Sequence, residues 1–447
     1  MRFKSFLLSL LLIGFSFASA QSAYADPTPE TLARLAVSEN ATESAPAIAA
    51  LREMGPKGLR VLFDVYRDEI KRHALEITAA GQTDTEWQRL TTALDAVSQQ
   101  RDSYMAGLYW YTDFEQAKRA AEASGKPILS LRLLGNLNEE FSCANSRFFR
   151  TVLYANREVS DALRERFILH WKSVRPAPRV TIDFGDGRKL ERTLTGNSIH
   201  YVLDPSGRVV DALPGLYGPQ AFLRGLAQAE DVVRQSAGKN DLQRRVLLDS
   251  YHRERINLIA ADWSADVQKT GGRVPDTVLA RIKARSTSVN PTAIEVAPVA
   301  ATKMVTEVNI LRAITTDARE LEAATNDAAW AKIAGLHASD ARLDESSTAL
   351  IRRQMPTAGE FWKASQGQLL RIVANLESNM ALDTVRNEYV LHNRLHAWLA
   401  NPAWNLTLDS LNEKVYAELF LTPASDPWLG LYSPDTYTAL ENGGIVK

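Results

Sequence analysis

The sequence predicts an α/β protein in which a central domain of alternating helices and strands lies between all-α N-terminal and C-terminal regions. Helix and strand patterns alternate within residues 106–237, whereas residues 26–105 and 238–447 show mainly the periodicity of helices. The chain of 447 residues is long enough for more than one domain. Its composition, 45% hydrophobic and 23% charged, is that of a globular protein.

Residues 1–25 have the pattern of a secretory signal peptide. Arg2 and Lys4 precede an apolar run at 6–17 that is too short for a comfortable membrane span. Ala23-Tyr24-Ala25 then offers small residues at the two positions that a signal peptidase reads. We therefore expect cleavage before Asp26 and a periplasmic or secreted protein. The alternative is that the segment stays in place as an N-terminal anchor.

The net charge indicates which partners are not expected, and the cysteine content indicates what stabilises the fold. The net charge is −1 and the basic residues are scattered, which gives no reason to expect nucleic acid or an anionic membrane as partner. No later stretch is apolar enough for a membrane span, so none is expected after signal cleavage. Cys143 is the only cysteine, so a hydrophobic core and not an internal disulfide must hold the fold. A lone thiol in an oxidising compartment is either buried or reactive.

The two outer regions are expected to be helical. In residues 26–105, apolar residues recur at helical spacing on both sides of Gly55-Pro56, and this pair separates two helices. Residues 238–447 are expected to form a helical domain that ends in an irregular tail at 421–447, which is rich in proline, glycine and aromatic residues.

The central domain, 106–237, is expected to contain an ordered series of helices and strands. Its first helix has Thr112 as N-cap and ends at Gly125. A second helix begins near Cys143, breaks near Asn156 and resumes. The expected strands are 128–134 and 167–174, followed by hairpins 179–184/188–194 and 199–203/208–213, and a last helix covers 220–235.

Four pieces of this domain together resemble the exported thioredoxin-like domains. They are an alanine-rich helix that ends in Gly125-Lys126-Pro127 before a buried strand, the tetrapeptide Cys143-Ala144-Asn145-Ser146, the helix and strand at 156–171, and the hairpin and helix at 203–226. The resemblance covers residues 108–236, under a third of the chain.

The resemblance implies a redox site at Cys143. Cys143 stands where the first cysteine of the Cys-x-x-Cys motif belongs, at a helix N-terminus, where backbone N–H groups favour a thiolate. Ser146 replaces the second cysteine and cannot resolve a mixed disulfide. The resemblance therefore implies at most monothiol thiol–disulfide chemistry toward an envelope protein or a low-molecular-weight thiol, with no cofactor. Asn145 would line this site.

A second departure concerns the proline that these domains place opposite the cysteine in a cis peptide bond. Here that position is Ser198, preceded by Asn197. A cis bond before a residue other than proline costs roughly 2.5–4 kcal/mol, so we expect a trans bond. Asn197, Ser198 or His200 would then face Cys143 in a different polar site.

The sequence leaves other roles for Cys143 open. The alternative interpretation is a buried structural residue, since free cysteine is among the most buried residue types. In that case the domain is redox-silent and serves as a scaffold or binding module of the cell envelope. A hydrolytic Cys143–His200 pair is a further alternative. Whether the protein is an enzyme stays open at this point.

A second group of polar residues lies in the C-terminal region. Glu388, His392 and His396 are four residues apart and share one helix face, and two histidines a turn apart are able to ligate zinc or iron. No glutamate follows the first histidine as in the metalloprotease motif. We expect hydrogen-bonded histidines and no bound metal.

Overall fold

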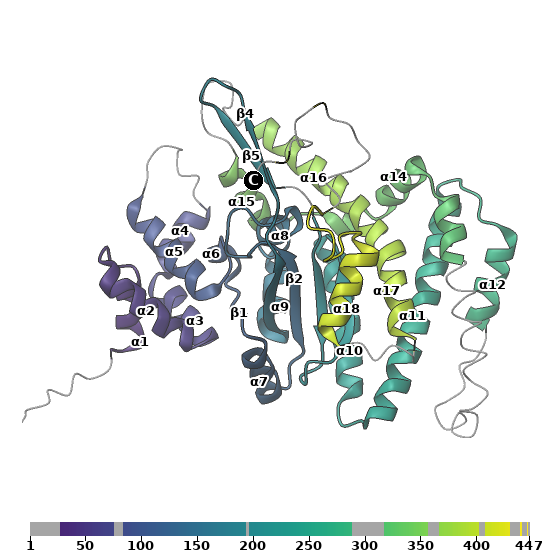
Figure 1. The fold of residues 1–447 in the computed structure, drawn as a ribbon, viewed down its shortest axis with the longest axis horizontal. Coiled ribbons are helices and arrows are strands. Elements are labelled where there is room, and N and C mark those ends of the chain that lie inside the picture. Colours follow the sequence, from purple (N-terminus) through teal and green to yellow (C-terminus); the bar gives the residue numbers. More distant parts are fainter. Residues whose placement is uncertain are drawn as a thin grey trace, which may run out of the picture.

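The computed structural model describes residues 27–75, 84–193, 196–287, 317–355, 366–401, 407–429, 439 and 445. The expected signal peptide at 1–25 lies outside these residues. A group of N-terminal helices, a central sheet and a group of C-terminal helices follow one another across the molecule (Figure 1). The protein is mixed α/β, as the sequence predicts.

The central sheet has five strands in the order β1-β3-β2-β6-β7. β1 and β2 run parallel to β3, while β6 is antiparallel to β2 and β7 is antiparallel to β6. All seven residues of β2 are buried, as in a central strand covered on both faces. The strands are β1 (Trp110–Tyr111), β2 (Ile128–Leu134), β3 (Ile168–Arg175), β6 (Ile199–Leu203) and β7 (Val209–Pro214).

Four helical segments of the central region connect these strands and cover the sheet, and their sequence signals are mostly where we expected them. Asp113, not Thr112, caps the first helix, because its carboxylate accepts the N–H of Gln116; the expected N-cap is thus wrong by one residue. Gly125 ends that helix with a φ of 69°. Asn156 caps the resumed helix. The segments are α7 (Phe114–Ser124), α8 (Ala144–Phe148) continued by η1 (Phe149–Leu153), α9 (Arg157–Arg166) and α10 (Pro219–Ser236).

The N-terminal helices pack around a core of their own beside strand β1. Pro56 begins α3 directly after Gly55, whose φ of 68° few other residues adopt, so the predicted break is confirmed. Arg52 donates to the backbone oxygens of Val97 and Trp110 and so ties α2 to the sheet edge. The helices are α1 (Pro29–Ala36), α2 (Ala41–Glu53), α3 (Pro56–Val65), α4 (Arg67–Leu75), α5 (Thr85–Ser98) and α6 (Ser103–Ala106).

The C-terminal helices share one hydrophobic core with the sheet, since a continuous cluster of buried residues extends from Ala106 to Leu429. No helix in the described part of the chain is long and apolar enough to cross a membrane. The segments are α11 (Asp241–Lys269), α12 (Asp276–Thr287), α14 (Asp327–Leu336), η2 (Ala338–Ala341), α15 (Glu345–Gln354), α16 (Gln366–Arg386), η4 (Asn387–His392), α17 (Asn393–Leu399), α18 (Leu408–Lys414) and η5 (Val415–Leu419).

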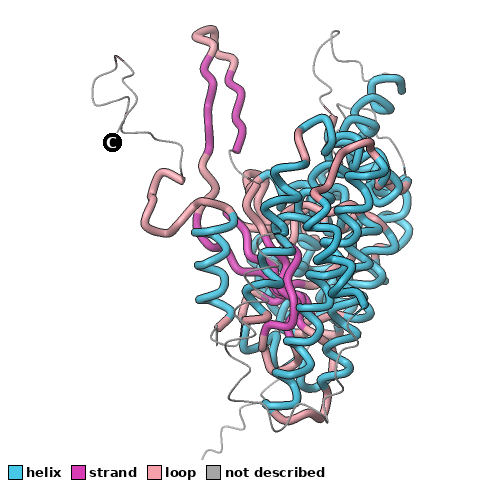
Figure 2. Tube along the Cα trace, turned by 90° about the vertical axis from the view of Figure 1, so that its right-hand side faces the viewer, coloured by secondary structure: helices cyan, strands magenta, loops and turns pink. Residues whose placement is uncertain are grey.

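The first expected hairpin forms a separate two-stranded sheet of β4 (Arg179–Asp183) and β5 (Lys189–Thr193). It projects from the body of the molecule (Figure 2). Every residue of β4 is exposed, so this hairpin adds little to the core.

Candidate functional site

Cys143 is the N-cap of α8 and follows the buried strand β2, where its N–H donates to the carbonyl of Leu134. The sulfur lies 3.0 Å from the hydroxyl of Ser198 and 3.4 Å from that of Ser146. The carbonyl oxygen of Asn197 is 4.0 Å away. The structure therefore brings Cys143 and Ser146 together with Asn197 and Ser198, which are more than 50 residues distant in the chain. Cys143 itself is 0% exposed.

Of the two remaining predicted residues, Asn145 belongs to this site, whereas His200 lies in a neighbouring aromatic cluster. Asn145 packs against the backbone of Gly196, at the start of the segment that carries Asn197 and Ser198. All peptide bonds in the described residues are trans, as we expected for Asn197–Ser198.

His200 does not join Cys143, so the Cys143–His200 pair is not formed. Its Nε2 pairs with the hydroxyl of Tyr154 at 2.6 Å, and its ring lies between Phe149 and Phe222. Burial lowers the pKa of His200 to about 3, so the ring is neutral and carries no charge that would favour a thiolate.

Residues 416–426, which we call the cover segment, close the Cys143 site. The hydroxyl of Tyr416 donates to the carbonyl of Asn197 at 3.0 Å, and the amide of Asn197 donates to the hydroxyl of Thr422 at 3.0 Å. Arg175, at the end of β3, donates to three backbone oxygens of the same segment. Burial raises the pKa of Tyr416 well above its ordinary value, so its hydroxyl keeps the proton that it donates.

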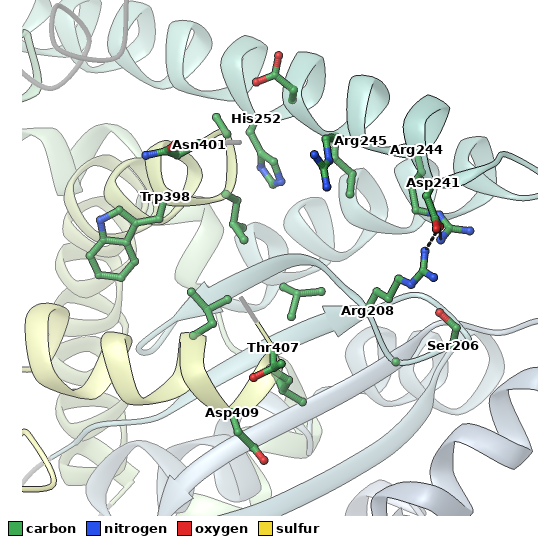
Figure 3. Close-up of a pocket in the computed structure, with 18 of the residues that line it drawn as sticks. Ser206, Arg208, Asp241, Arg244, Arg245, His252, Trp398, Asn401, Thr407 and Asp409 are labelled. Atoms are coloured by element: carbon green, nitrogen blue, oxygen red, sulfur yellow. Dashed lines mark hydrogen bonds and ion pairs between the residues drawn. The ribbon is translucent and has the colours of Figure 1, made fainter. Parts of the chain in front are cut away.

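A second site, which we call the cationic pocket, lies on the other face of the sheet, between α11 and α18 (Figure 3). Side chains alternate along a strand, so Arg132 of β2 points away from Leu131 and Leu133, which belong to the same core cluster as Cys143. The cavity has a volume of about 800 Å³. Its charged lining consists of the bases Lys118, Arg132, Lys172, Arg208, Arg244 and Arg245 and the acids Asp241, Asp249 and Asp409.

Arg132 is the least solvated base of this pocket. It is 2% exposed, and one of its amino groups donates to the hydroxyl of Ser130 at 2.6 Å. Its nearest carboxylate oxygen belongs to Asp409, is 3.6 Å away and sits on a side chain that is 70% exposed. Its Nε has no hydrogen-bond partner among the described residues. A buried cation normally has a close anionic partner. In the described part of the chain Arg132 has only the 3.6 Å ion pair with the exposed Asp409.

A neutral histidine, His170, lies beside the guanidinium of Arg132. Nδ1 of His170 lies 2.8 Å from the hydroxyl of Ser130 and 3.4 Å from Arg132. Burial, followed by the charge of Arg132, lowers the pKa of His170 to about 3. His170 therefore adds no charge to the pocket.

No protein-family model, curated protein or solved structure matches this chain. Its function is therefore inferred from its own side chains. Arg132, Tyr416 and Thr422 carried no signal in the sequence analysis. A basic residue in an apolar strand and polar residues near the C-terminus acquire meaning only through contacts that are distant in sequence.

The third group contains the predicted residues Glu388, His392 and His396. His392 lies between two carboxylates, with Nε2 at 3.0 Å from Asp211 and Nδ1 at 3.1 Å from Glu388. Nδ1 of His396 lies 2.9 Å from Nδ1 of His252. The structure thus confirms that His392 and His396 are neighbours, and it adds Asp211 and His252, which the sequence analysis missed.

Proposed function

We propose that the protein is an exported, redox-silent binding protein built on a thioredoxin-like central domain, and that its ligand is an anion held in the cationic pocket. The order of elements supports the resemblance: a helix, a central strand, a helix that begins at Cys143, a parallel strand, and then an antiparallel pair with a closing helix. The two-stranded hairpin β4–β5 is an insertion between β3 and β6.

The observation that carries the binding role is the buried guanidinium of Arg132, whose ion pair with the exposed Asp409 spans 3.6 Å. A carboxylate or phosphate in the pocket would accept hydrogen bonds from the guanidinium, and such charge-assisted bonds are about twice as strong as neutral ones. The volume of about 800 Å³ lies within the range of small-molecule sites. The ligand class is therefore a small carboxylate or phosphate compound.

The burial of Cys143 supports the redox-silent part of the proposal. Thiol–disulfide exchange requires a thiolate that a partner sulfur is able to reach. In the described residues the hydrogen-bonding neighbours of the sulfur are two hydroxyls and one carbonyl, with no cation among them. The cover segment also occupies the approach through Asn197.

Monothiol exchange is the second candidate function, and the position of Cys143 at the start of a helix favours it. It requires the cover segment to move away from Asn197 before a partner disulfide reaches the sulfur. Alkylation of native Cys143 separates the two: labelling as slow as global unfolding supports the silent domain, whereas rapid labelling supports exchange.

Anion binding is tested by thermal unfolding with citrate or inorganic phosphate against sodium chloride of equal ionic strength. A ligand at 100 times its Kd stabilises the folded state by about 2.7 kcal/mol. We expect this gain in the wild type and in Arg188→Gln, a control at the tip of the β4–β5 hairpin, and its loss in Arg132→Gln.

Arg245→Gln, at the exposed rim of the pocket, keeps the test open should Arg132→Gln fail to fold. We expect it to weaken anion binding. Equal effects of citrate, phosphate and chloride on the wild type would refute the proposed function.

A further inference from the structure

Four side chains with metal-binding atoms converge at the edge of the sheet formed by β7. They are Asp211 of β7, His252 of α11, His392 of η4 and His396 of α17. All four are buried, with exposed fractions of 3% or less. We propose that they form a binding site for one transition-metal ion, which their chemistry identifies best as Zn²⁺. This proposal does not depend on anion binding in the cationic pocket.

The donor atoms of Asp211, His392 and His396 lie within 4.8 Å of one another, close enough to share one ion. Metal–nitrogen and metal–oxygen bonds of 2.0–2.2 Å place the ligands of a tetrahedral site about 3.3–3.6 Å from one another. Oδ1 of Asp211 lies 3.0 Å from Nε2 of His392 and 3.8 Å from Nδ1 of His396. Nδ1 of His396 lies 2.9 Å from Nδ1 of His252. His252 lies outside this set of three, and a rotation of its ring toward them would complete the tetrahedron.

Hydrogen bonding leaves one nitrogen of the histidine pair unsatisfied. Nδ1 of His252 and Nδ1 of His396 face each other at 2.9 Å and share one proton, so one ring donates and the other accepts. Nε2 of the fully buried His396 has no hydrogen-bond partner among the described residues. Buried polar atoms in folded proteins are nearly always satisfied. A cation at the centre of the cluster would use the lone pairs of both facing nitrogens.

A second layer of side chains holds two of the four ligands in orientation. Glu388 lies 3.1 Å from Nδ1 of His392, on the side of the ring away from Asp211, and is itself held by Arg255 at 3.0 Å. The hydroxyl of Tyr251 donates to Oδ2 of Asp211, which leaves Oδ1 toward the histidines. A carboxylate behind a ligating histidine is typical of zinc sites, because it fixes the tautomer and raises ligand basicity.

The donor set and the burial also indicate the kind of metal and its role. Three imidazoles and one carboxylate suit Zn²⁺ better than the hard cations Mg²⁺ and Ca²⁺, which prefer oxygen ligands. Four protein ligands leave no open position, as in structural zinc sites. The ion would join β7 to α11, η4 and α17, and so fasten the C-terminal helices to the sheet.

The site is tested first on the untagged full chain, expressed in medium supplemented with zinc. We expect about one zinc per chain by elemental analysis. Removal of the ion with a chelator should lower the Tm, and addition of ZnCl2 should restore it. Co²⁺ added to the metal-free chain should give the visible absorption of a tetrahedral site.

Variants assign the ligands. Asp211→Asn and His396→Gln should lose at least nine-tenths of the bound zinc, and Glu388→Gln should weaken affinity by about 10–100-fold. His200→Gln is the matched control, because His200 is an equally buried ring of the same sheet outside the cluster, and it should retain the metal. Should the ligand variants misfold, the Co²⁺ titration of the wild type still decides. A wild-type chain that is purified without metal, takes up no Co²⁺ and gains no stability from ZnCl2 would overturn the proposal.

Discussion

The Cys143 site and the cationic pocket lie on opposite faces of the same sheet, yet one is sealed and the other is open. A single stretch of chain, residues 408–426, contributes to both. Leu408, Asp409 and Leu411 of α18 form a wall of the cationic pocket. Tyr416 and Thr422, a few residues later, close the Cys143 site.

This difference shows that the accessibility of a site, and not the presence of a sequence motif, decides which of the two is able to accept a ligand. The Cys143 site keeps the position that the resemblance assigns to a nucleophile, but its polar atoms satisfy one another and the cover segment excludes solvent. In the cationic pocket a buried guanidinium borders a cavity of about 800 Å³, and its ion pair with the exposed Asp409 spans 3.6 Å. A ligand is therefore better accommodated at this weakly paired guanidinium than at the sealed thiol.

The largest effect should follow a change in the stretch that both sites share. Leu411 is fully buried between α18 and the sheet, so Leu411→Ala should lower the free energy of unfolding by about 2–5 kcal/mol. It should also speed the alkylation of Cys143 and weaken anion binding. Denaturant unfolding and thiol labelling measure this, with Leu370→Ala, a substitution at a side chain 63% exposed, as control. An effect on one site alone would show that the two are closed independently.

The next largest effect concerns the pH dependence of stability, to which one buried histidine on each face of the sheet contributes. His200 on the thiol side and His170 on the pocket side both have a pKa lowered to about 3, so each is neutral when folded and takes up a proton near pH 6.5 when unfolded. Stability is thus present above pH 6.5 and is lost as the pH falls toward 3. Between pH 6.5 and 4, each ring should cost about 3 kcal/mol of unfolding free energy.

Single substitutions separate the two contributions. Urea unfolding across this pH range should be less steep for His200→Gln and for His170→Gln than for the wild type. Bound anion should reduce the contribution of His170 but not that of His200, because it offsets the charge of Arg132 beside His170 alone. An equal change at both rings would argue against an anion at Arg132.

The smallest effect should come from one hydrogen bond of the cover segment. Tyr416→Phe removes the bond to Asn197 and should cost about 0.5–1.5 kcal/mol of unfolding free energy. The alkylation of Cys143 should become faster, while anion binding stays unchanged. Asp409→Asn is the converse variant, and it should strengthen anion binding without affecting the thiol. If Tyr416→Phe left the alkylation rate unchanged, the cover segment would not control access to the sulfur.

The sequence alone determined the class of the fold and the elements of the central region. The strands at 128–134 and 199–203, the break at Gly55-Pro56 and the helix end at Gly125 rest on local periodicity and backbone preference, and the structure has all of them. It also determined that Cys143 and Ser146 are neighbours, since residues three apart in the first turn of a helix meet.

Only the tertiary structure decided which distant residues contact the functional side chains. His252 meets His396 across 144 residues of chain, and Asn197 meets Tyr416 across 219. The burial of Cys143 and the weak pairing of Arg132 with Asp409 likewise depend on where α18 and the cover segment pack. Such contacts depend on how distant elements pack, and the sequence of either segment alone shows no pattern that predicts them. Local hydrogen bonding and backbone preference, by contrast, depend on neighbouring residues and can be predicted from the sequence.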